Sequence, residues 1–264
     1  MKQLIFTDLD GTFLNHHNYS FEASFEALQK IKALEIPLIF TTSKTKAEVE
    51  RLQQKVGIAE PFIVENGAAL FIPEDYQDFD LSFLRNYEDK KVMIFGKTYA
   101  KVLAFYNFYK DECGMLGFSE MSDIQVSELT GLEQRSVLLA KQRDFSEPFI
   151  LEDENKLEEL KKLARGYELK VTKGGRFYHL IGELQDKGIA VIETIELFEE
   201  LYKEKIIAIA LGDSENDIPM LERVQKPILI QKHDGSYLET NLANIQKSSY
   251  IGSKGWNEMV LKNV

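Results

Sequence analysis

Two aspartates end an apolar run near the N-terminus, in the stretch IFTDLDGTFL (residues 5–14). The run before them is typical of a buried strand, and Asp8 and Asp10 are separated by a single residue. Two neighbouring carboxylates repel each other and are costly to remove from water, so a compensating charge is needed. A divalent cation is the simplest source of that charge. The stretch therefore favours a fold whose first strand delivers paired carboxylates to a metal site.

Composition limits the partners of the chain. Its 264 residues suit one large domain or two smaller ones, and a net charge of −11 argues against general affinity for nucleic acid or membranes. An anionic small-molecule substrate would then need a local basic island. The single cysteine, Cys113, excludes an intrachain disulfide, and we expect it in the core. Apolar runs are too short for a signal peptide or a membrane span, so we expect a cytoplasmic protein.

Strand-like and helical stretches alternate over the first third of the chain. Residues 3–7 and 36–42 are typical of strands, 21–35 and 46–57 of helices, and 61–73 of a hairpin whose turn includes Asn66-Gly67. This alternation predicts an α/β fold with a doubly wound parallel sheet. Ligands of such sheets bind beyond the carboxyl ends of the strands, where Asp8 and Ser43 are expected.

The pattern changes after about residue 80 and returns at Asp186. The middle block combines predicted helices at 98–112, 127–141 and 153–165 with short strands, and its aromatic residues are expected in its core. From Asp186 a helix, the buried strand IIAIAL and the strand PILIQK follow. We therefore predict a catalytic core of residues 1–82 and 188–264, interrupted by an inserted α+β unit of residues 83–187.

Several polar residues lie at or near the positions where these strands are expected to end. They are Asp8, Asp10, Ser43, Lys44, Lys187, Asp213 and Asp217. Several carboxylates together suit Mg²⁺, and a hydroxyl and ammonium groups beside a metal suit a phosphoryl group. Side chains at i and i+2 share a face in extended backbone, so one aspartate can attack phosphorus while the other handles a proton.

Each of these stretches has an ordinary structural explanation when taken alone. Residues 8–12 could be a turn after a strand, residues 213–217 the acidic start of a helix, and Lys187 a surface lysine. A calcium loop of the EF-hand type is excluded because its twelfth position would be Tyr19 rather than glutamate. Only the ordered combination favours one phosphoryl-transfer site.

In this order, DLDGT, Ser43, Lys187 and GDSEND resemble the four motifs of the haloacid dehalogenase-like phosphatase superfamily. An insertion between the second and third motifs resembles its C2-type cap. A narrower resemblance, to the mannosyl-3-phosphoglycerate phosphatase family, is carried by TTSKTKAEVE, IVENGAALFIP, RDFSEP, GGRFYHL and GDSENDIPML. Many superfamily members have Gly-Arg after the second-motif hydroxyl, whereas this chain has Lys44-Thr45, which favours the narrower family.

The resemblance implies roles for the acidic residues. Asp8 would attack phosphorus and form an aspartyl-phosphate. Asp10 would protonate the departing glycerate oxygen and then activate the hydrolytic water. Mg²⁺ would be held by Asp8, the backbone carbonyl of Asp10 and Asp213, with Asp217 either as a further ligand or behind the ligands.

The resemblance also implies how the substrate is held. Ser43 and Lys187 would bind phosphoryl oxygens, and a substrate carboxylate invites an arginine fork, for which Arg143 and Arg176 are the candidates. The remaining candidates lie near these motifs or at a core strand end: Lys44, Glu65, Asn66, Ser146, Thr172, Gly175 and Asn216. The four histidines are scattered and receive no role.

The leading hypothesis is a Mg²⁺-dependent phosphatase that converts mannosyl-3-phosphoglycerate, and also the glucosyl compound, to the glycosylglycerate used as a compatible solute. The alternatives are a phosphatase of trehalose or sucrose phosphate, a phosphomutase, and a non-catalytic phosphosugar-binding module. The complete set of motifs argues against the binding module, which would have no use for both Asp8 and Asp10. Crossings near residues 82 and 187 predict a hinge on which the cap closes and excludes water.

Overall fold

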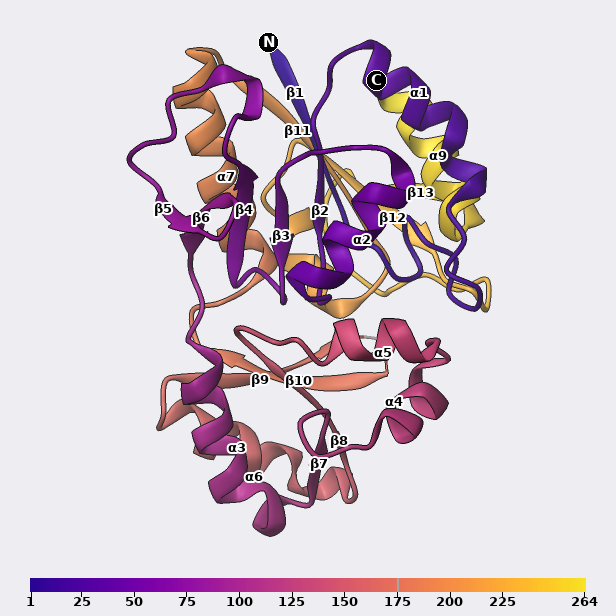
Figure 1. Ribbon diagram of the computed structural model, residues 1–264. Coiled ribbons are helices and arrows are strands. Elements are labelled where there is room, and N and C mark those ends of the chain that lie inside the picture. The colour runs from indigo at the N-terminus through magenta and orange to yellow at the C-terminus, as the bar shows by residue number, and fades with distance from the viewer. Residues whose placement is uncertain (175) are drawn as a thin grey trace.

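The computed structural model describes residues 1–174 and 176–264, which form two sheets with helices around them (Figure 1). The strand order of the larger sheet is β13-β12-β11-β1-β2-β3-β4-β6-β5, and that of the smaller sheet is β7-β8-β10-β9. We call the larger sheet with its helices the large unit, and the smaller sheet with α3 to α6 the small unit. Within the described residues, no helix combines the length and the apolar character needed to cross a membrane.

The large unit is built around β1, which pairs in parallel with both β2 and β11. Its strands are β1 (Lys2–Thr7), β2 (Leu38–Thr41), β3 (Phe62–Val64), β4 (Ala69–Pro73), β5 (Arg85–Tyr87), β6 (Lys90–Ile94), β11 (Ile206–Gly212), β12 (Lys226–Gln231) and β13 (Gln246–Ile251). Its helices are α1 (Phe25–Ala33), α2 (Lys46–Val56), α7 (Lys187–Tyr202), α8 (Ile218–Leu221) and α9 (Gly252–Asn263).

Helices cover both faces of this sheet, which explains why its inner strands are apolar without alternation. Residues of α1, α2 and α9 pack on one face, and Trp256 is completely buried there. Residues of α7 and α8 pack on the other face, with Phe198 completely buried. The predicted α/β fold with a doubly wound sheet and an inserted α+β unit is confirmed.

The predicted first boundary of the insertion, at residue 82, is wrong. Strand β6 pairs antiparallel with β4, with Val92 opposite Phe71, and β5 pairs with β6. Residues 85–94 therefore extend the large sheet. Their polar sequence reflects an exposed edge, since Arg85 and Asn86 are both exposed.

The small unit is an antiparallel sheet backed by helices. Its elements are α3 (Tyr99–Cys113), β7 (Met115–Gly117), α4 (Asp123–Thr130), α5 (Gln134–Ala140), β8 (Glu147–Leu151), α6 (Leu157–Arg165), β9 (Leu169–Gly174) and β10 (Phe177–Gly182). The helix predicted over 127–141 is divided into α4 and α5, because Gly131 ends α4 with a φ of +75°. Cys113 lies in the apolar core as predicted, whereas Phe108, also predicted there, is exposed.

The small unit lies across the carboxyl ends of the parallel strands. In Figure 1, β9, β10 and α5 are the parts of the small unit nearest to the large unit. The Thr45 hydroxyl at the start of α2 donates a hydrogen bond to the carbonyl of Leu139 in α5, over 2.9 Å. This arrangement covers the edge of the sheet at which both β1 and β11 end.

Candidate active site

Asp8 follows β1 directly and is held in line with the sheet. Its backbone N–H donates to the carbonyl of Leu211 in β11 over 2.9 Å, and 5% of the residue is exposed. The chain then reverses at Gly11, whose φ is +85°. A Cβ atom there would lie 2.7 Å from Oδ2 of Asp213, so glycine is needed for both the conformation and the close approach.

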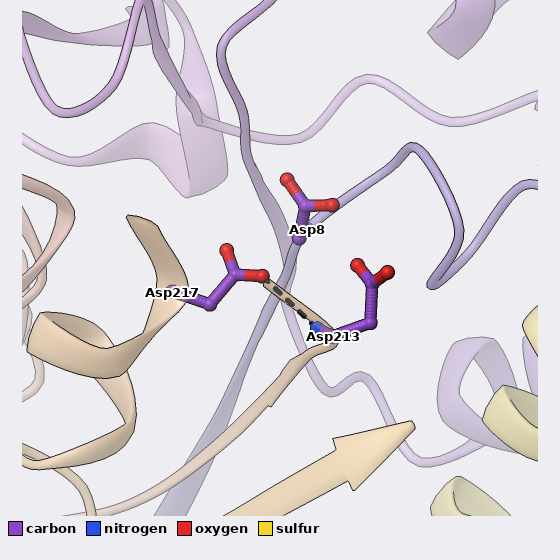
Figure 2. Close-up of side chains that lie close together, drawn as sticks. All are labelled: Asp8, Asp213 and Asp217. Atoms are coloured by element: carbon purple, nitrogen blue, oxygen red, sulfur yellow. Dashed lines mark hydrogen bonds between the residues drawn. The ribbon is translucent and has the colours of Figure 1, made fainter. Parts of the chain in front are cut away.

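Three carboxylates meet at this edge of the sheet (Figure 2). Asp8, Asp213 and Asp217 each offer an oxygen, and the three oxygens lie within 4.8 Å of one another. Burial raises the pKa of Asp8 well above its usual value, and burial together with the Asp217 charge raises the pKa of Asp213 to about 7. Buried hard oxygen donors with surplus negative charge suit a divalent cation such as Mg²⁺.

Asp217 is bound more tightly to the protein than the other two. Its Oδ2 accepts the backbone N–H groups of Asp213 and Ser214, each over 3.0 Å, and its Oδ1 lies 2.6 Å from Nζ of Lys187. Both oxygens are thus engaged. Asp217 therefore orients the loop that carries Asp213.

Lys187 begins α7 and lies between two carboxylates. Its Nζ is 2.6 Å from Oδ1 of Asp8 and 2.6 Å from Oδ1 of Asp217, and its side chain is completely buried. Burial alone would lower the pKa of Lys187, but the carboxylates of Asp217 and Asp8 outweigh it and raise the pKa above its ordinary value. The ammonium therefore stays charged beside Asp8.

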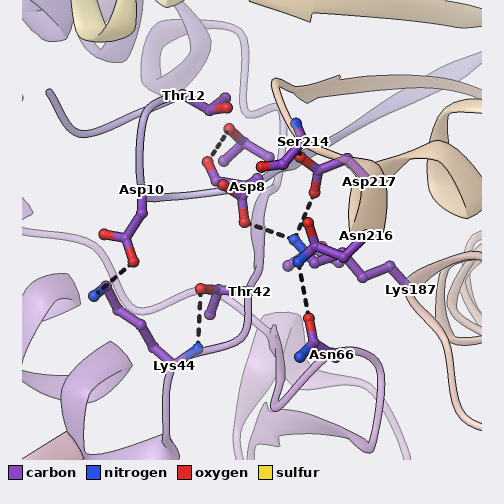
Figure 3. A network of polar contacts seen from close by, with 12 residues as sticks. Asp8, Asp10, Thr12, Thr42, Lys44, Asn66, Lys187, Ser214, Asn216 and Asp217 are labelled. Atoms are coloured by element: carbon purple, nitrogen blue, oxygen red, sulfur yellow. Dashed lines mark hydrogen bonds and ion pairs between the residues drawn. The ribbon is translucent and has the colours of Figure 1, made fainter. Parts of the chain in front are cut away.

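Asp10 points away from the carboxylate cluster and toward Lys44 (Figure 3). Oδ2 of Asp10 lies 2.9 Å from Nζ of Lys44, which also lies 3.5 Å from Glu48. Burial would lower the pKa of Lys44, but the Asp10 and Glu48 carboxylates raise it above its usual value. Oδ1 of Asp10 is buried without a hydrogen-bond partner among the described residues.

Arg143 reaches from the small unit to the loop after β2. Its two terminal nitrogens donate to the backbone carbonyl of Ser43 over 2.9 and 3.2 Å. Its Nε has no hydrogen-bond partner among the described residues and lies 4.0 Å from Oε2 of Glu65. Arg143 thus clamps the Ser43 backbone in this structure, and its contact with a substrate carboxylate stays a prediction.

Glu65 and Ser146, which are both predicted to contact substrate, bind each other in this structure. The completely buried Glu65 carboxylate accepts the hydroxyl of Ser146 over 2.7 Å and the backbone N–H groups of Asp144 and Phe145 over 2.8 and 3.1 Å. Neither residue lines the cavity described below. Together they fix the loop that carries Arg143.

A cavity of about 380 Å³ lies between the two units. Its large-unit side includes Asp8, Ser43 and Asp213, and its small-unit side includes Arg143, Arg176 and His179. Asp10, Lys44 and Asn216 line it as well. The volume falls in the range of pockets that take small organic ligands.

Other predicted residues stand outside this cavity. Asn66 lies behind Asn216, whose Nδ2 donates to Oδ1 of Asn66 over 2.9 Å. Thr172 lies in β9 opposite His179 and is not among the lining residues. Gly175 lies outside the described residues.

Histidines are the residues that sequence reasoning missed. His16, His233 and His179 all line the cavity, although they lie far apart in the chain. His179 is buried in β10, and its Nδ1 has no partner among the described residues. No spacing or motif connects these positions, so only the fold shows that they belong together.

Known proteins resemble this chain over nearly its whole length. A family model described as haloacid dehalogenase-like hydrolase matches residues 5–237. A glucosyl-3-phosphoglycerate/mannosyl-3-phosphoglycerate phosphatase of Persephonella marina is 48% identical over 258 residues, which are 97% of this chain and 95% of that protein. A phosphatase of the same description from Methanococcoides burtonii is 42% identical over 99% of this chain and 97% of its own.

Solved structures show the same fold. A haloacid dehalogenase-like hydrolase from B. subtilis superimposes with a TM-score of 0.70 at 17% identity, covering 99% of this chain and 100% of that one. At this identity the likeness concerns the fold alone.

Proposed function

The chain belongs to the haloacid dehalogenase-like hydrolase family, and from this premise we propose that it is a Mg²⁺-dependent phosphatase that hydrolyses mannosyl-3-phosphoglycerate and glucosyl-3-phosphoglycerate. One observation carries the proposal. The Asp8 carboxylate lies at the floor of a cavity between the units, beside Lys187 and Asp213. The two relatives at 48% and 42% identity, whose names give this activity, supply the substrate class.

Asp8 is the proposed nucleophile. Lys187 holds Oδ1 of Asp8, which leaves Oδ2 to attack phosphorus. The new Asp8–phosphorus bond forms as the bond to the glycerate oxygen breaks, and Asp10 gives that oxygen its proton. Asp10 then takes a proton from a water molecule that attacks the aspartyl-phosphate, which releases inorganic phosphate and restores Asp8.

The acidic cluster would hold the metal. We propose Asp8, the backbone carbonyl of Asp10 and Asp213 as ligands, with Asp217 orienting them through its bonds to the backbone of residues 213 and 214. Bound there, Mg²⁺ would neutralise charge on the phosphoryl oxygens. The three buried carboxylates share only the Lys187 ammonium as a counter-charge, and this surplus of negative charge supports the role.

The phosphoryl group would be held by the Ser43 hydroxyl and the Lys187 ammonium. The Arg143 clamp on the Ser43 carbonyl supports the placement of that hydroxyl, since it fixes the backbone of the loop. Lys44 would hold the Asp10 carboxylate in place through their ion pair. The small unit would act as a cap that decides which leaving group fits.

Phosphate release is the experiment that tests the proposal. The protein is assayed with mannosyl- and glucosyl-3-phosphoglycerate, with trehalose 6-phosphate and sucrose 6-phosphate beside them, with Mg²⁺ and with EDTA. We expect Mg²⁺-dependent release that is fastest on the glycosyl-3-phosphoglycerates. Asp8→Asn should lower kcat by at least about 10³-fold, because the nucleophile is lost. Asp80→Asn, at an exposed position, is the matched control.

Other outcomes point to the alternatives. Faster release from trehalose or sucrose phosphate would keep the chemistry and overturn the substrate. Conversion of a sugar phosphate to its isomer without phosphate release would indicate a phosphomutase. Binding without turnover, equal in wild type and Asp8→Asn, would leave only a binding module.

A further inference from the structure

We propose that His16 and His233 of the large unit and Arg176 of the small unit form a subsite for the carboxylate of the substrate. The inference rests on the proposed function and deepens it, because it names the residues that recognise the glycerate part. The three residues come from separate segments of the chain, and all three line the same cavity as Asp8.

The three side chains come together from separate segments. The rings of His16 and His233 are stacked, with centroids 4.0 Å apart and planes 6° from parallel. The Arg176 guanidinium lies 3.3 Å from Nε2 of His16. Since arginine can only donate, Nε2 of His16 is the acceptor and its ring is neutral in this arrangement. The group is therefore a built contact between both units.

Charge makes this group a site for an anion. Burial lowers the pKa of His16, and the nearby His233, Arg176 and His17 lower it further, with Asp10 acting in the opposite direction. Lys232 lines the same part of the cavity. Arg176 and Lys232 are cationic groups in this lining, whose carboxylates are those of Asp8, Asp10, Glu48 and Asp213. An anion placed in this group can accept hydrogen bonds from Arg176, from Lys232 and from the N–H group of each imidazole ring.

A carboxylate fits this site better than the phosphoryl group does. In the proposed function the phosphoryl group is bound by Asp8 and Ser43, which line the cavity, and by Lys187, which lies beside Asp8. The rival arginine, Arg143, has both terminal nitrogens on the Ser43 carbonyl. Arg176 instead anchors one terminal nitrogen on the carbonyls of Leu129 and Thr130 and turns the other toward His16.

A carboxylate bound in the subsite would bridge the two units. His16 and His233 belong to the large unit and Arg176 to the small one, so a carboxylate bound among them would hold the units together. A substrate without a carboxylate would lose this link while it keeps every contact to its phosphoryl group. Loss of a subsite residue should therefore raise KM for the glycerate compound. It should leave KM unchanged for an analogue that lacks the carboxylate.

The test compares two substrates on matched variants. Glucosyl-3-phosphoglycerate is compared with glucosylglycerol 3-phosphate, in which a hydroxymethyl group replaces the carboxylate. His16→Gln, His233→Gln and Arg176→Gln should each raise KM for the first substrate by about tenfold, because each loses a partner of a charged group. KM for the second should change by less than about twofold. Arg165→Gln is the control, since this exposed arginine of α6 does not line the cavity.

Equal effects of these variants on both substrates, or no effect on either, would overturn the subsite. A second measurement separates it from the proposed function: calorimetric binding of glucosylglycerate and of glucosylglycerol, which need no hydrolysis. Tighter binding of the carboxylate compound that is lost in His16→Gln supports the subsite even if no phosphate is released. Phosphate release without any preference for the carboxylate would leave the proposed function standing and refute the subsite.

Discussion

Lys187 shows how strongly single residues of the site depend on one another. Its ammonium is the nearest compensating charge for two buried carboxylates, those of Asp8 and Asp217. A buried ion pair adds little stability as a whole, because desolvation offsets the attraction. Removal of one partner is different, since it leaves the remaining charges buried and unpaired.

We predict that Lys187→Met lowers the free energy of unfolding by about 3–5 kcal/mol in the absence of Mg²⁺. The side chains have similar volume, so packing changes little. Urea unfolding in EDTA measures the effect, and Lys32→Met, at an exposed position of α1, is the control. A loss no larger than that of the control would show that the two carboxylates are not charged in the folded protein.

His179 makes stability depend on pH. Burial, and then the charges of Arg143 and Lys187, lower its pKa to about 3. The unfolded chain, with an ordinary histidine pKa of about 6.5, binds a proton between these values that the folded chain does not. The contribution of His179 is thus fully present above pH 6.5 and is lost as the pH falls below it, by about 1.4 kcal/mol per pH unit.

We therefore predict that wild type loses about 2 kcal/mol more than His179→Gln does when the pH falls from 6.5 to 5.0. Urea unfolding at the two pH values gives the difference, and carboxylates that titrate elsewhere cancel in the comparison. His17→Gln, which changes an exposed ring, should behave like wild type. Parallel losses in wild type and His179→Gln would contradict the prediction.

At the scale of elements, the turn between β3 and β4 connects the two units. Glu65 and Asn66 both have positive φ, at +49° and +61°. This conformation is unfavourable for residues other than glycine, so it must be held by surrounding contacts. The Glu65 carboxylate has such contacts with the loop at 144–146, and its carbonyl accepts a hydrogen bond from Gln185 over 2.5 Å.

Glu65→Gln should lower the free energy of unfolding by about 1–3 kcal/mol, because an amide nitrogen would face a donor in place of a carboxylate oxygen. It should also lower kcat, since the loop that carries the Arg143 clamp loses its anchor. Denaturant unfolding and phosphate release measure the two effects, with the exposed Glu22→Gln as control. Unchanged stability would mean that the loop does not depend on this carboxylate.

At the scale of the whole molecule, the cavity is enclosed by contacts between the units. The Tyr19 hydroxyl donates to the Thr130 carbonyl over 2.9 Å, and Arg51 lies 2.9 Å from Glu133. The Arg51–Glu133 pair is at the surface, whereas the contacts of Glu65 with the loop at 144–146 are in the interior. A substrate can reach Asp8 if the units separate, and the links at 95–98 and 183–186 are where the chain crosses between them.

We predict that the protein in solution is more open without ligand than with it. Small-angle scattering should show a smaller radius of gyration after addition of Mg²⁺ with orthovanadate and glucosylglycerate. Tyr19→Phe, which removes one contact between the units, should shift the ligand-free protein further toward the open form. Identical scattering curves with and without these ligands would count against closure.

Local amino-acid patterns were enough to predict the fold class and to propose the acidic residues of the site. Apolar runs that end in Asp8, Ser43 and Asp213 are local patterns, and the geometry of a parallel sheet brings their ends together whatever the details of packing. The order of the motifs was therefore enough to predict a phosphoryl-transfer site. The edge strands at 85–94 escaped the prediction because their exposed side chains carry no apolar pattern.

The contacts of the remaining polar residues depend on the packing of the two units. Nothing local distinguishes Glu65, which anchors a loop, from a residue that faces substrate, or links His16 to His233 more than two hundred positions away. Such contacts depend on how the small unit lies over the large one. A side chain's partners come from segments that are distant in the chain, so they are settled only when both units pack together.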